Sequence, residues 1–426
     1  MNRQVISIML IAYCLTSIYA MAEDIPALNH LSFNQVEELF ITNNRELLAA
    51  KRFVEGSEAD TIIAGQKPNP NLSLNTTNFK LNQSNGGSSL ADKTIDTIVR
   101  VDQLVERGNK RELRVAAAED ALQASKFDLK DTYRQQKLVL QKAYYDLLLN
   151  QEKERYLDNN QALYQKTLAA AELRLAAGDI SATDVARIRV DALRAKNDLR
   201  QAQSEREKSQ SDLAYLIGKE KQAREIVVSD TWPDVTSNPI SLDDTQTATL
   251  EKRPDILAAE ARKRTAEENR RLAEAFKTRD VTVGMQYEHY PNDSRNTIGA
   301  GISIPLFTNY QYQGEIAKAE VFYTAAMEAQ EQARASAVGE IERAKSDLRS
   351  AIEKLQRFDQ QMLQEARKAA DAAEFAYQHG AMGVTDLLDA RRILKTLELE
   401  AVTVRADYAK SLASWQAATT NTEENQ

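Results

Sequence analysis

The sequence predicts a mainly α-helical chain that is duplicated once and carries short strands belonging to a membrane β-barrel. Three observations lead to this fold class. Glycine (14) and proline (8) are sparse among 426 residues, of which 28% are charged, and this composition is typical of long helices. Apolar residues recur every seven positions over residues 306–415. A second copy of the same arrangement lies upstream in the chain.

The heptad pattern occurs on both arms of residues 306–415, on either side of a turn at residues 380–386. On the first arm it comprises Ile341, Leu348, Leu355 and Met362, with Ala337, Ala344, Ala351 and Phe358 at the second heptad position. On the return arm it comprises Leu387, Leu394, Ala401, Tyr408 and Trp415, with Ala390, Leu397 and Val404. Such spacing predicts a long antiparallel helical hairpin preceded by a strand, and the alanines allow close helix approach.

The bulk composition excludes several classes of protein. A net charge of -8 gives no basic surface for nucleic acid. Mean hydropathy is -0.52, and beyond the N-terminus no apolar run reaches the roughly 18 to 20 residues of a membrane helix. Short alternating strands of a barrel remain compatible with these values.

Residues 1–22 have the pattern of an export signal peptide. Arg3 provides the positive end, residues 5–15 the apolar core, and Ala20-Met21-Ala22 a small-x-small cleavage site. The only cysteine, Cys14, lies inside this segment, so the cleaved chain would have no disulfide or thiolate metal site. Lipidation of Cys14 is the alternative to ordinary cleavage.

Residues 23–218 form the first predicted repeat. We expect a helix over 33–64 with a capping box at Ser32 and Gln35, then strands over 71–79 and 95–105 joined by a flexible loop at 80–94. A helix of about 70 residues follows over 108–177, since no helix breaker interrupts it. The chain then turns at 178–184 and returns as a helix over 184–217.

Residues 219–249 are predicted to form an irregular connector. Residues 250–417 are predicted to repeat the order of helix, two strands, long helix and return helix. Strands are expected over 279–287 and 298–306, separated by a loop at 288–296. Gly178, Thr183 and Asp184 match Gly380, Thr385 and Asp386 at one fixed offset, which indicates an internal duplication. Residues 418–426 form a short polar tail that we expect to be disordered.

Four strands per chain are too few to close a barrel, and an open sheet would leave its edges exposed. Three copies would supply twelve strands, with the glycines and serines opposite Ile298–Leu306 facing the lumen. The long helices of three chains would continue this barrel as a helical tube. The alternative is a pair of soluble hairpins packed on the helices.

Two stretches at the ends of strands resemble the heavy-metal, CzcC/CusC-like branch of the TolC-type outer-membrane efflux proteins. They are Gln103–Arg111, with Asn109 in place of a glycine common there, and Ile302–Phe307 followed by Gln313–Ala317. The resemblance covers essentially the whole mature chain. It implies a homotrimer in the outer membrane of a Gram-negative bacterium that extends into the periplasm, with a lipid bilayer around its strands. It also implies a periplasmic adaptor and an inner-membrane pump, the RND type being the expected one.

The resemblance also assigns roles at the hairpin ends. Asp386 and Asp389 resemble the family's aperture motif, and in three copies they would place six carboxylates at the narrow end of the tube. Tyr377 and Asp184 occupy the positions of a tyrosine and an aspartate that bond between neighbouring hairpins in the family, whereas the partnering arginine aligns with Met382. The residues expected to contact the adaptor are Gly178, Thr183, Gly380, Gly383 and Thr385. Helix N-terminal chemistry and C-capping are the simpler explanations for these aspartates and glycines.

An enzyme is not expected. His30, His289 and His379 lack metal-ligand spacing, no phosphate loop or nucleophile motif is present, and we expect no cofactor or metal site. The sequence therefore predicts the exit duct of a tripartite efflux system, with divalent metal cations as candidate substrates. A duct for type I protein secretion and a periplasmic coiled-coil scaffold without transport remain the alternatives.

Overall fold

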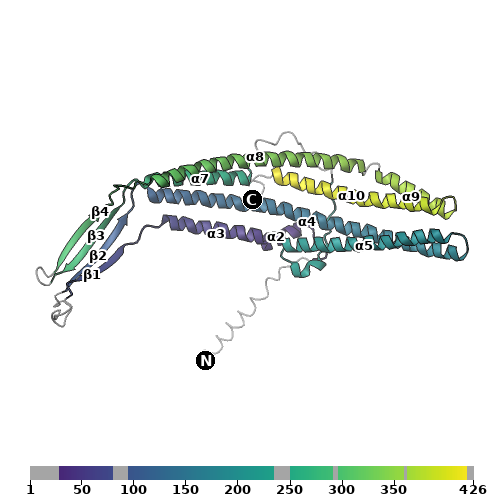
Figure 1. Ribbon diagram of the computed structural model, residues 1–426, viewed down its shortest axis with the longest axis horizontal. Helices are drawn as coiled ribbons and strands as arrows, with labels where there is room; N and C mark the ends of the chain where they lie inside the picture. The colour runs from purple at the N-terminus through teal and green to yellow at the C-terminus, as the bar shows by residue number, and fades with distance from the viewer. Residues whose placement is uncertain (1–27, 80–94, 235–249, 291–295, 359–361, 420–426) are drawn as a thin grey trace, which may run out of the picture. The chain divides into compact units, whose positions relative to one another are not determined.

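The computed structural model describes residues 28–79, 95–234, 250–290, 296–358 and 362–419 (Figure 1). The signal peptide at 1–22 with Cys14, the loop at 80–94, part of the connector and most of the tail lie outside these ranges. The elements of the first repeat are α2 (Phe33–Asn43), α3 (Arg45–Gly65), β1 (Asn71–Thr77), β2 (Asp96–Val105), α4 (Lys110–Ala176) and α5 (Ala182–Leu216). After η2 (Glu220–Glu225), the second contributes α7 (Pro254–Ala275), β3 (Val281–His289), β4 (Thr297–Ser303), α8 (Gln313–Arg357), α9 (Leu363–Gln378) and α10 (Val384–Thr419).

This order confirms the predicted mainly α-helical, duplicated fold with four strands per chain. Within the described ranges, no helix combines the length and apolar composition that a membrane span requires. The chain packs into two compact units that both draw on the two repeats. The hairpin unit comprises Met1–Arg45, Gln135–Ile240 and Ala344–Ala417, and the sheet unit comprises Glu46–Arg134, Ser241–Arg343 and Ala418–Gln426.

The sheet unit contains one antiparallel sheet in the order β1-β2-β3-β4, which Figure 1 shows as four adjacent arrows. Pairing of Val101 with Leu72 and with Met285 fixes its register, so that side chains alternate between two faces. One is the apolar face, formed by Leu72, Leu74, Thr76, Thr97, Val99, Val101, Gln103, Val105, Val281, Val283, Met285, Tyr287, His289, Ile298, Ala300 and Ile302. Most of the large apolar side chains of this face are exposed in the single chain.

Every predicted strand is present, but the boundaries differ from the prediction: β1 ends at Thr77 and not at Phe79, and β3 begins at Val281 and not at Arg279. β3 continues to His289, where a loop was expected from Glu288, because Glu288 and His289 pair with Ile98 and Thr97 of β2. β4 ends at Ser303 and does not reach Leu306. Pairing with β2 therefore makes β3 longer than its alternating sequence predicts. β4 is shorter than its alternating sequence predicts.

The helix expected over 33–64 is two helices, and that expectation is wrong at Asn44. Asn44 is extended (ψ 125°), and its side-chain amide donates to the Leu216 carbonyl oxygen at 3.2 Å. Gly218 lies so close that a Cβ there would approach the Asn43 Cβ to 2.8 Å. The break is therefore fixed by the end of α5, which is distant in sequence. The predicted capping box at Ser32 and Gln35 is present.

The first arm of the second hairpin, expected as one uninterrupted helix, is described as α8 and α9. Phe358 and Met362 have π-helical hydrogen bonding, and residues between them lie outside the described ranges. The predicted heptad positions are buried up to Phe358, but Met362 is 43% exposed and Leu363 is 9% exposed. The pattern then continues through Ala366, Ala370 and Ala373, one residue later than predicted. The assignment of Met362 to the buried face is thus wrong.

Candidate functional site

The two helical hairpins of the hairpin unit end in glycine turns of the same construction. Gly178 (φ +84°) follows α4, and Gly380 (φ +72°) follows α9. After each glycine an amide bonds back to a carbonyl five residues earlier, from Asp179 to Arg174 at 2.9 Å and from Ala381 to Ala376 at 2.8 Å. This is the Schellman motif, in which glycine adopts the left-handed conformation without a steric cost. The C-capping function expected for these two glycines is therefore present.

An apolar cluster joins the hairpin ends. Its buried members are Tyr164, Ala171, Val185, Ile188, Ala192, Ala195, Val384 and Leu388, and Leu168, Ile180 and Tyr377 pack against it. These residues come from α4, the turn that follows it, α5, α9 and α10. Burial raises the pKa of the Tyr164 phenol because it disfavours the phenolate. The cluster holds α5 and α10 close together at their N-terminal ends.

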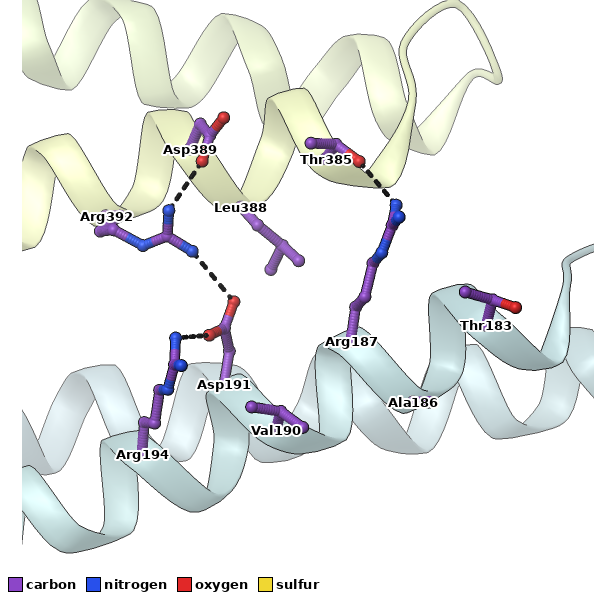
Figure 2. Close-up of a pocket in the computed structure, with 10 residues that line it drawn as sticks. All are labelled: Thr183, Ala186, Arg187, Val190, Asp191, Arg194, Thr385, Leu388, Asp389 and Arg392. Carbon is purple, nitrogen blue, oxygen red and sulfur yellow. Dashed lines mark hydrogen bonds and ion pairs between the residues drawn. The ribbon is translucent and has the colours of Figure 1, made fainter.

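A surface groove of about 450 Å³ lies between these ends of α5 and α10 (Figure 2). We call it the end groove. It is lined by Thr183, Ala186, Arg187, Val190, Asp191, Arg194, Thr385, Leu388, Asp389 and Arg392. Figure 2 shows Arg392 reaching from α10 toward Asp191 on α5, and Arg187 reaching from α5 toward Thr385 on α10.

Charged side chains cross the end groove in alternating sign. Arg392 donates to Asp389 at 2.9 Å and lies 3.6 Å from Asp191. Asp191 also accepts from Arg194 at 3.4 Å. Arg187 donates to the Thr385 hydroxyl at 3.1 Å. The groove can therefore bind a polar partner through either guanidinium or carboxylate groups beside the apolar side chains of Val190 and Leu388.

The predicted aperture residues occupy different surroundings. Asp389 lines the end groove and pairs with Arg392, whereas Asp386 is exposed on α10 and is not among the lining residues. Asp184 accepts a hydrogen bond from the Ser181 hydroxyl at 2.8 Å and lies 3.9 Å from Arg187. Ser181 in turn caps α5, so Asp184 has the helix N-terminal role that the sequence allowed.

The remaining predicted residues divide in the same way. Tyr377 packs against the apolar cluster, and the Arg174 guanidinium lies 5.3 Å from its ring centroid. Thr183 and Thr385 line the end groove. Gly383, unlike Gly380, is not at positive φ in the described chain, and its carbonyl accepts from Leu387 at 3.3 Å. Within one chain, therefore, the contacts that Tyr377 and Asp184 make are with different residues, and the two are not bonded to each other in the described chain.

Sequence reasoning missed the basic residues of this region. Arg187 and Arg392 line the groove, and the 5% exposed Arg391 donates to Thr167 at 2.8 Å and to Glu374 at 2.7 Å. One signal was available, because Arg187 in the first repeat matches Asp389 in the second at the offset of the turns. Both of these equivalent positions line the end groove. Among the described residues, no group of three or more His, Cys, Asp or Glu is arranged to hold a metal ion.

A four-stranded sheet combined with duplicated long helical hairpins defines the class of TolC-like channel proteins. The outer membrane efflux protein family model matches residues 38–219 and 247–421. The chain belongs to the outer membrane efflux protein family. It is therefore a transport channel of the outer membrane and not an enzyme.

Three relatives align over most of the chain. The pyoverdine export outer membrane protein OpmQ of Pseudomonas aeruginosa is 24% identical over 86% of this chain and 80% of its own length. The outer membrane protein TolC of Vibrio cholerae is 25% identical, with 89% and 87% covered. The cobalt-zinc-cadmium resistance protein CzcC of Cupriavidus metallidurans is 23% identical, with 83% and 81% covered.

Solved structures support the fold. The outer membrane protein VceC of Vibrio cholerae superposes with a TM-score of 0.74 at 20% identity, covering 91% of this chain and 96% of that one. CusC superposes with a TM-score of 0.71 at 18% identity, covering 91% and 92%. The predicted TolC-type family and its CzcC/CusC-like members are thus found among the relatives and neighbours.

Proposed function

We propose that this chain is the exit duct of a tripartite efflux system, assembled as a homotrimer. Substrates, with divalent metal cations as the favoured class, would enter from a periplasmic adaptor and an inner-membrane pump of the RND type. The observation that carries the proposal is the sheet, which has one exposed apolar face and two edge strands, β1 and β4, that pair on one side only within the chain.

The sheet supplies the reason for assembly. Unpaired edge groups and a row of exposed apolar side chains are both costly in isolation. Pairing β1 of one copy with β4 of the next removes the edges, and three copies give twelve strands, an even number within the usual range for membrane barrels. The apolar face would then contact lipid, and the glycine- and serine-containing face would line the lumen.

The hairpin ends are the proposed site of adaptor contact and of the aperture. The turns at Gly178 and Gly380 are closed by Schellman hydrogen bonds, and the end groove beside them offers apolar surface with charges of both signs. Asp386 is exposed and, with Asp389, would contribute six carboxylates in three copies. Removing them also removes the ion pair of Asp389 with Arg392, which itself reaches Asp191 of α5, so the end is expected to loosen and the conductance of the duct to rise.

The metal assignment rests on one relative, whose name states cobalt-zinc-cadmium resistance, and on the resemblance of Gln103–Arg111 to that branch. Deleting the gene and measuring growth with cobalt, zinc and cadmium salts tests it. Increased sensitivity to these salts supports metal efflux. Normal growth with metals but loss of an exported protein from the medium would favour type I secretion, the alternative function.

Planar bilayers test the duct itself. The purified trimer is expected to form pores, and Asp386→Ala with Asp389→Ala is expected to raise their conductance. The matched control is Glu58→Ala with Asp60→Ala, which removes two exposed carboxylates from α3. Equal conductance of the two double variants would count against the aperture assignment. A water-soluble species without pores would indicate the scaffold alternative.

A further inference from the structure

The charged residues of the four strands all lie on the face opposite the apolar one. We call it the polar face; it is formed by Asn71, Ser73, Asn75, Thr77, Asp96, Ile98, Arg100, Asp102, Leu104, Thr282, Gly284, Gln286, Glu288, Thr297, Gly299, Gly301 and Ser303. Arg100 is the single Lys or Arg within β1–β4, alongside the carboxylates of Asp96, Asp102 and Glu288. A lone cation among three anions requires a structural reason.

Arg100 is held in one orientation by its neighbours. Its Nε donates to both carboxylate oxygens of Asp102, at 2.9 and 2.8 Å, and its Nη1 donates to Gln286 Oε1 at 2.9 Å. The Arg100 and Asp102 side chains are only 31% and 22% exposed, although they lie on an open sheet face. Charge-assisted bonds of this geometry are the stronger class of hydrogen bond.

Two glycines make room for this pair. Gly284 and Gly301 lie beside Asp102 in the sheet register. A Cβ on Gly284 would overlap the Asp102 carboxylate and would approach Arg100 Nη2 to 2.7 Å. At Gly301 a Cβ would meet Arg100 Nη2 at 3.6 Å, which is an ordinary contact. The ion pair therefore lies flat over the backbone of β3, and this arrangement depends on Gly284.

We propose that the Arg100–Asp102 pair, seated on Gly284, is the charge-selectivity element of the strand-lined part of the duct. This rests on the proposed function, because it requires three polar faces to enclose a lumen. The pair neutralises one of three carboxylates in each chain, so that the lumen wall keeps an excess of negative charge. The remaining carboxylates, Asp96 and Glu288, favour cationic solutes over anions, the pair limits the size of this preference, and its flat position keeps the passage wide. Fixed charges on the wall of a narrow passage determine in this way whether cations or anions pass more easily.

Reversal potentials in a KCl gradient test the electrostatic part. Arg100→Gln leaves Asp102 unpaired, and the cation-to-anion permeability ratio is expected to rise roughly twofold to fivefold, since one wall charge changes the local potential by about one kT or more. Asp102→Asn is expected to lower the ratio by a similar factor. Arg100→Lys keeps the charge and is expected to preserve the native ratio.

Two glycine variants test whether the Arg100–Asp102 pair depends on the space at Gly284. Gly284→Ala displaces the flexible ends of Arg100 and Asp102 into the lumen, and conductance is expected to fall measurably. Gly301→Ala adds the same methyl group on the next strand without overlap and is the matched control. Migration of each variant as a heat-sensitive trimer on gels checks that it assembles.

The outcomes separate the two proposals. Pores from the unsubstituted chain, combined with native reversal potentials in both Arg100→Gln and Asp102→Asn, would overturn the selectivity element and leave the duct standing. Equal conductance of Gly284→Ala and Gly301→Ala would overturn the role of the seat. Failure of the unsubstituted chain to form any pore would overturn the duct and the selectivity element together.

Discussion

Arg253 is fully buried at the N-cap of α7, in the sheet unit. Its guanidinium donates to Asp255 at 3.1 and 2.8 Å, to Glu340 at 2.7 Å, and to the carbonyl oxygen of Ala418 at 2.7 Å. Glu340 also accepts from Arg134 at 3.0 Å. Arg253 therefore links the start of α7 to α8 and to the end of α10. Its positive charge is balanced by the carboxylates of Asp255 and Glu340.

Replacing Arg253 is expected to be severely destabilising. Arg253→Met leaves Asp255 and Glu340 without their main partner and the Ala418 carbonyl without a donor, so the loss is about 3–5 kcal/mol. Thermal melting of the detergent-solubilised protein, followed by circular dichroism, measures it. Arg52→Met is the control, because Arg52 pairs with Glu55 on the exposed surface of α3 and should leave the melting temperature unchanged. Equal melting temperatures for both variants would contradict the role of Arg253.

The same cluster predicts acid sensitivity. Burial opposes ionisation of Asp255 and Glu340, but hydrogen bonds and charge from Arg253 outweigh it, so both pKa values lie below their ordinary values of 3.8 and 4.5. Groups with a lowered pKa stabilise the folded state above the ordinary pKa and lose this effect as the pH falls through the lowered value. The melting temperature should therefore fall as the pH drops below about 4.

Arg253→Met should remove this acid sensitivity, because without Arg253 the effect of burial is no longer outweighed and both pKa values rise. Asp131 acts with the opposite sign, since burial outweighs Arg134 and raises its pKa. Its preference for the folded state is present at low pH and is lost as the pH rises through the raised pKa. Parallel pH–melting curves for the native chain and Arg253→Met would contradict the assignment.

At the scale of elements, the informative feature is the junction of α8 and α9. The buried positions before it are Ile341, Leu348 and Leu355, spaced by seven, whereas those after it are shifted by one residue. A π-helical turn accommodates one extra residue and rotates everything that follows. The apolar residues of α9 consequently remain buried although the strict heptad pattern has been broken.

Alanine substitution at neighbouring positions distinguishes the two registers. Leu363→Ala is expected to cost about 2 kcal/mol, because it removes a buried side chain. Met362→Ala is expected to have little effect, since Met362 is 43% exposed. An uninterrupted heptad predicts the reverse order. Chemical denaturation measures the free energy of unfolding of both variants. A larger loss of this free energy for Met362→Ala would support the uninterrupted heptad register.

At the scale of the whole molecule, assembly determines whether the chain can perform its proposed function. The described sheet has β1 and β4 as its edges, with Leu74 and Ala300 on the apolar face of these strands. Within one chain, β2 and β3 separate the two edges, by a distance of roughly three strand spacings of 4.8 Å. In a closed ring, β1 and β4 of neighbouring copies become adjacent.

Cysteine cross-linking tests ring closure. In a Cys14→Ser background, Leu74→Cys with Ala300→Cys is expected to give dimer and trimer bands with a short bifunctional thiol reagent, and none larger. Either cysteine alone provides the control, because a single site per chain cannot link three copies. A ladder extending beyond three would show an open assembly, and monomer alone would contradict edge pairing.

Much of this architecture was predictable because its signals are local and repeated. The long α4, the turns at Gly178 and Gly380, and the capping box at Ser32 follow from composition, missing helix breakers and turn chemistry. The predicted aspartates were found at helix starts, as their sequence context indicated. Arg187, Asp191 and Arg392 each have a charged partner three residues away on the same helix. Their contacts across the groove, from Arg187 to Thr385 and from Arg392 to Asp191, join helices that are distant in sequence and carry no local signal.

The sequence by itself determined the helical class, the duplication and the alternation of the strands, because apolar periodicity and glycine positions depend only on neighbours along the chain. Only the tertiary structure decided where helices break and which charges meet. Asn44 ends α2 because of the Leu216 carbonyl, and Leu363 rather than Met362 is buried at the start of α9. The pair of Arg100 and Asp102 lies flat because Gly284, on another strand, leaves space beneath it. Each of these depends on a contact between distant segments, and such contacts exist only after folding.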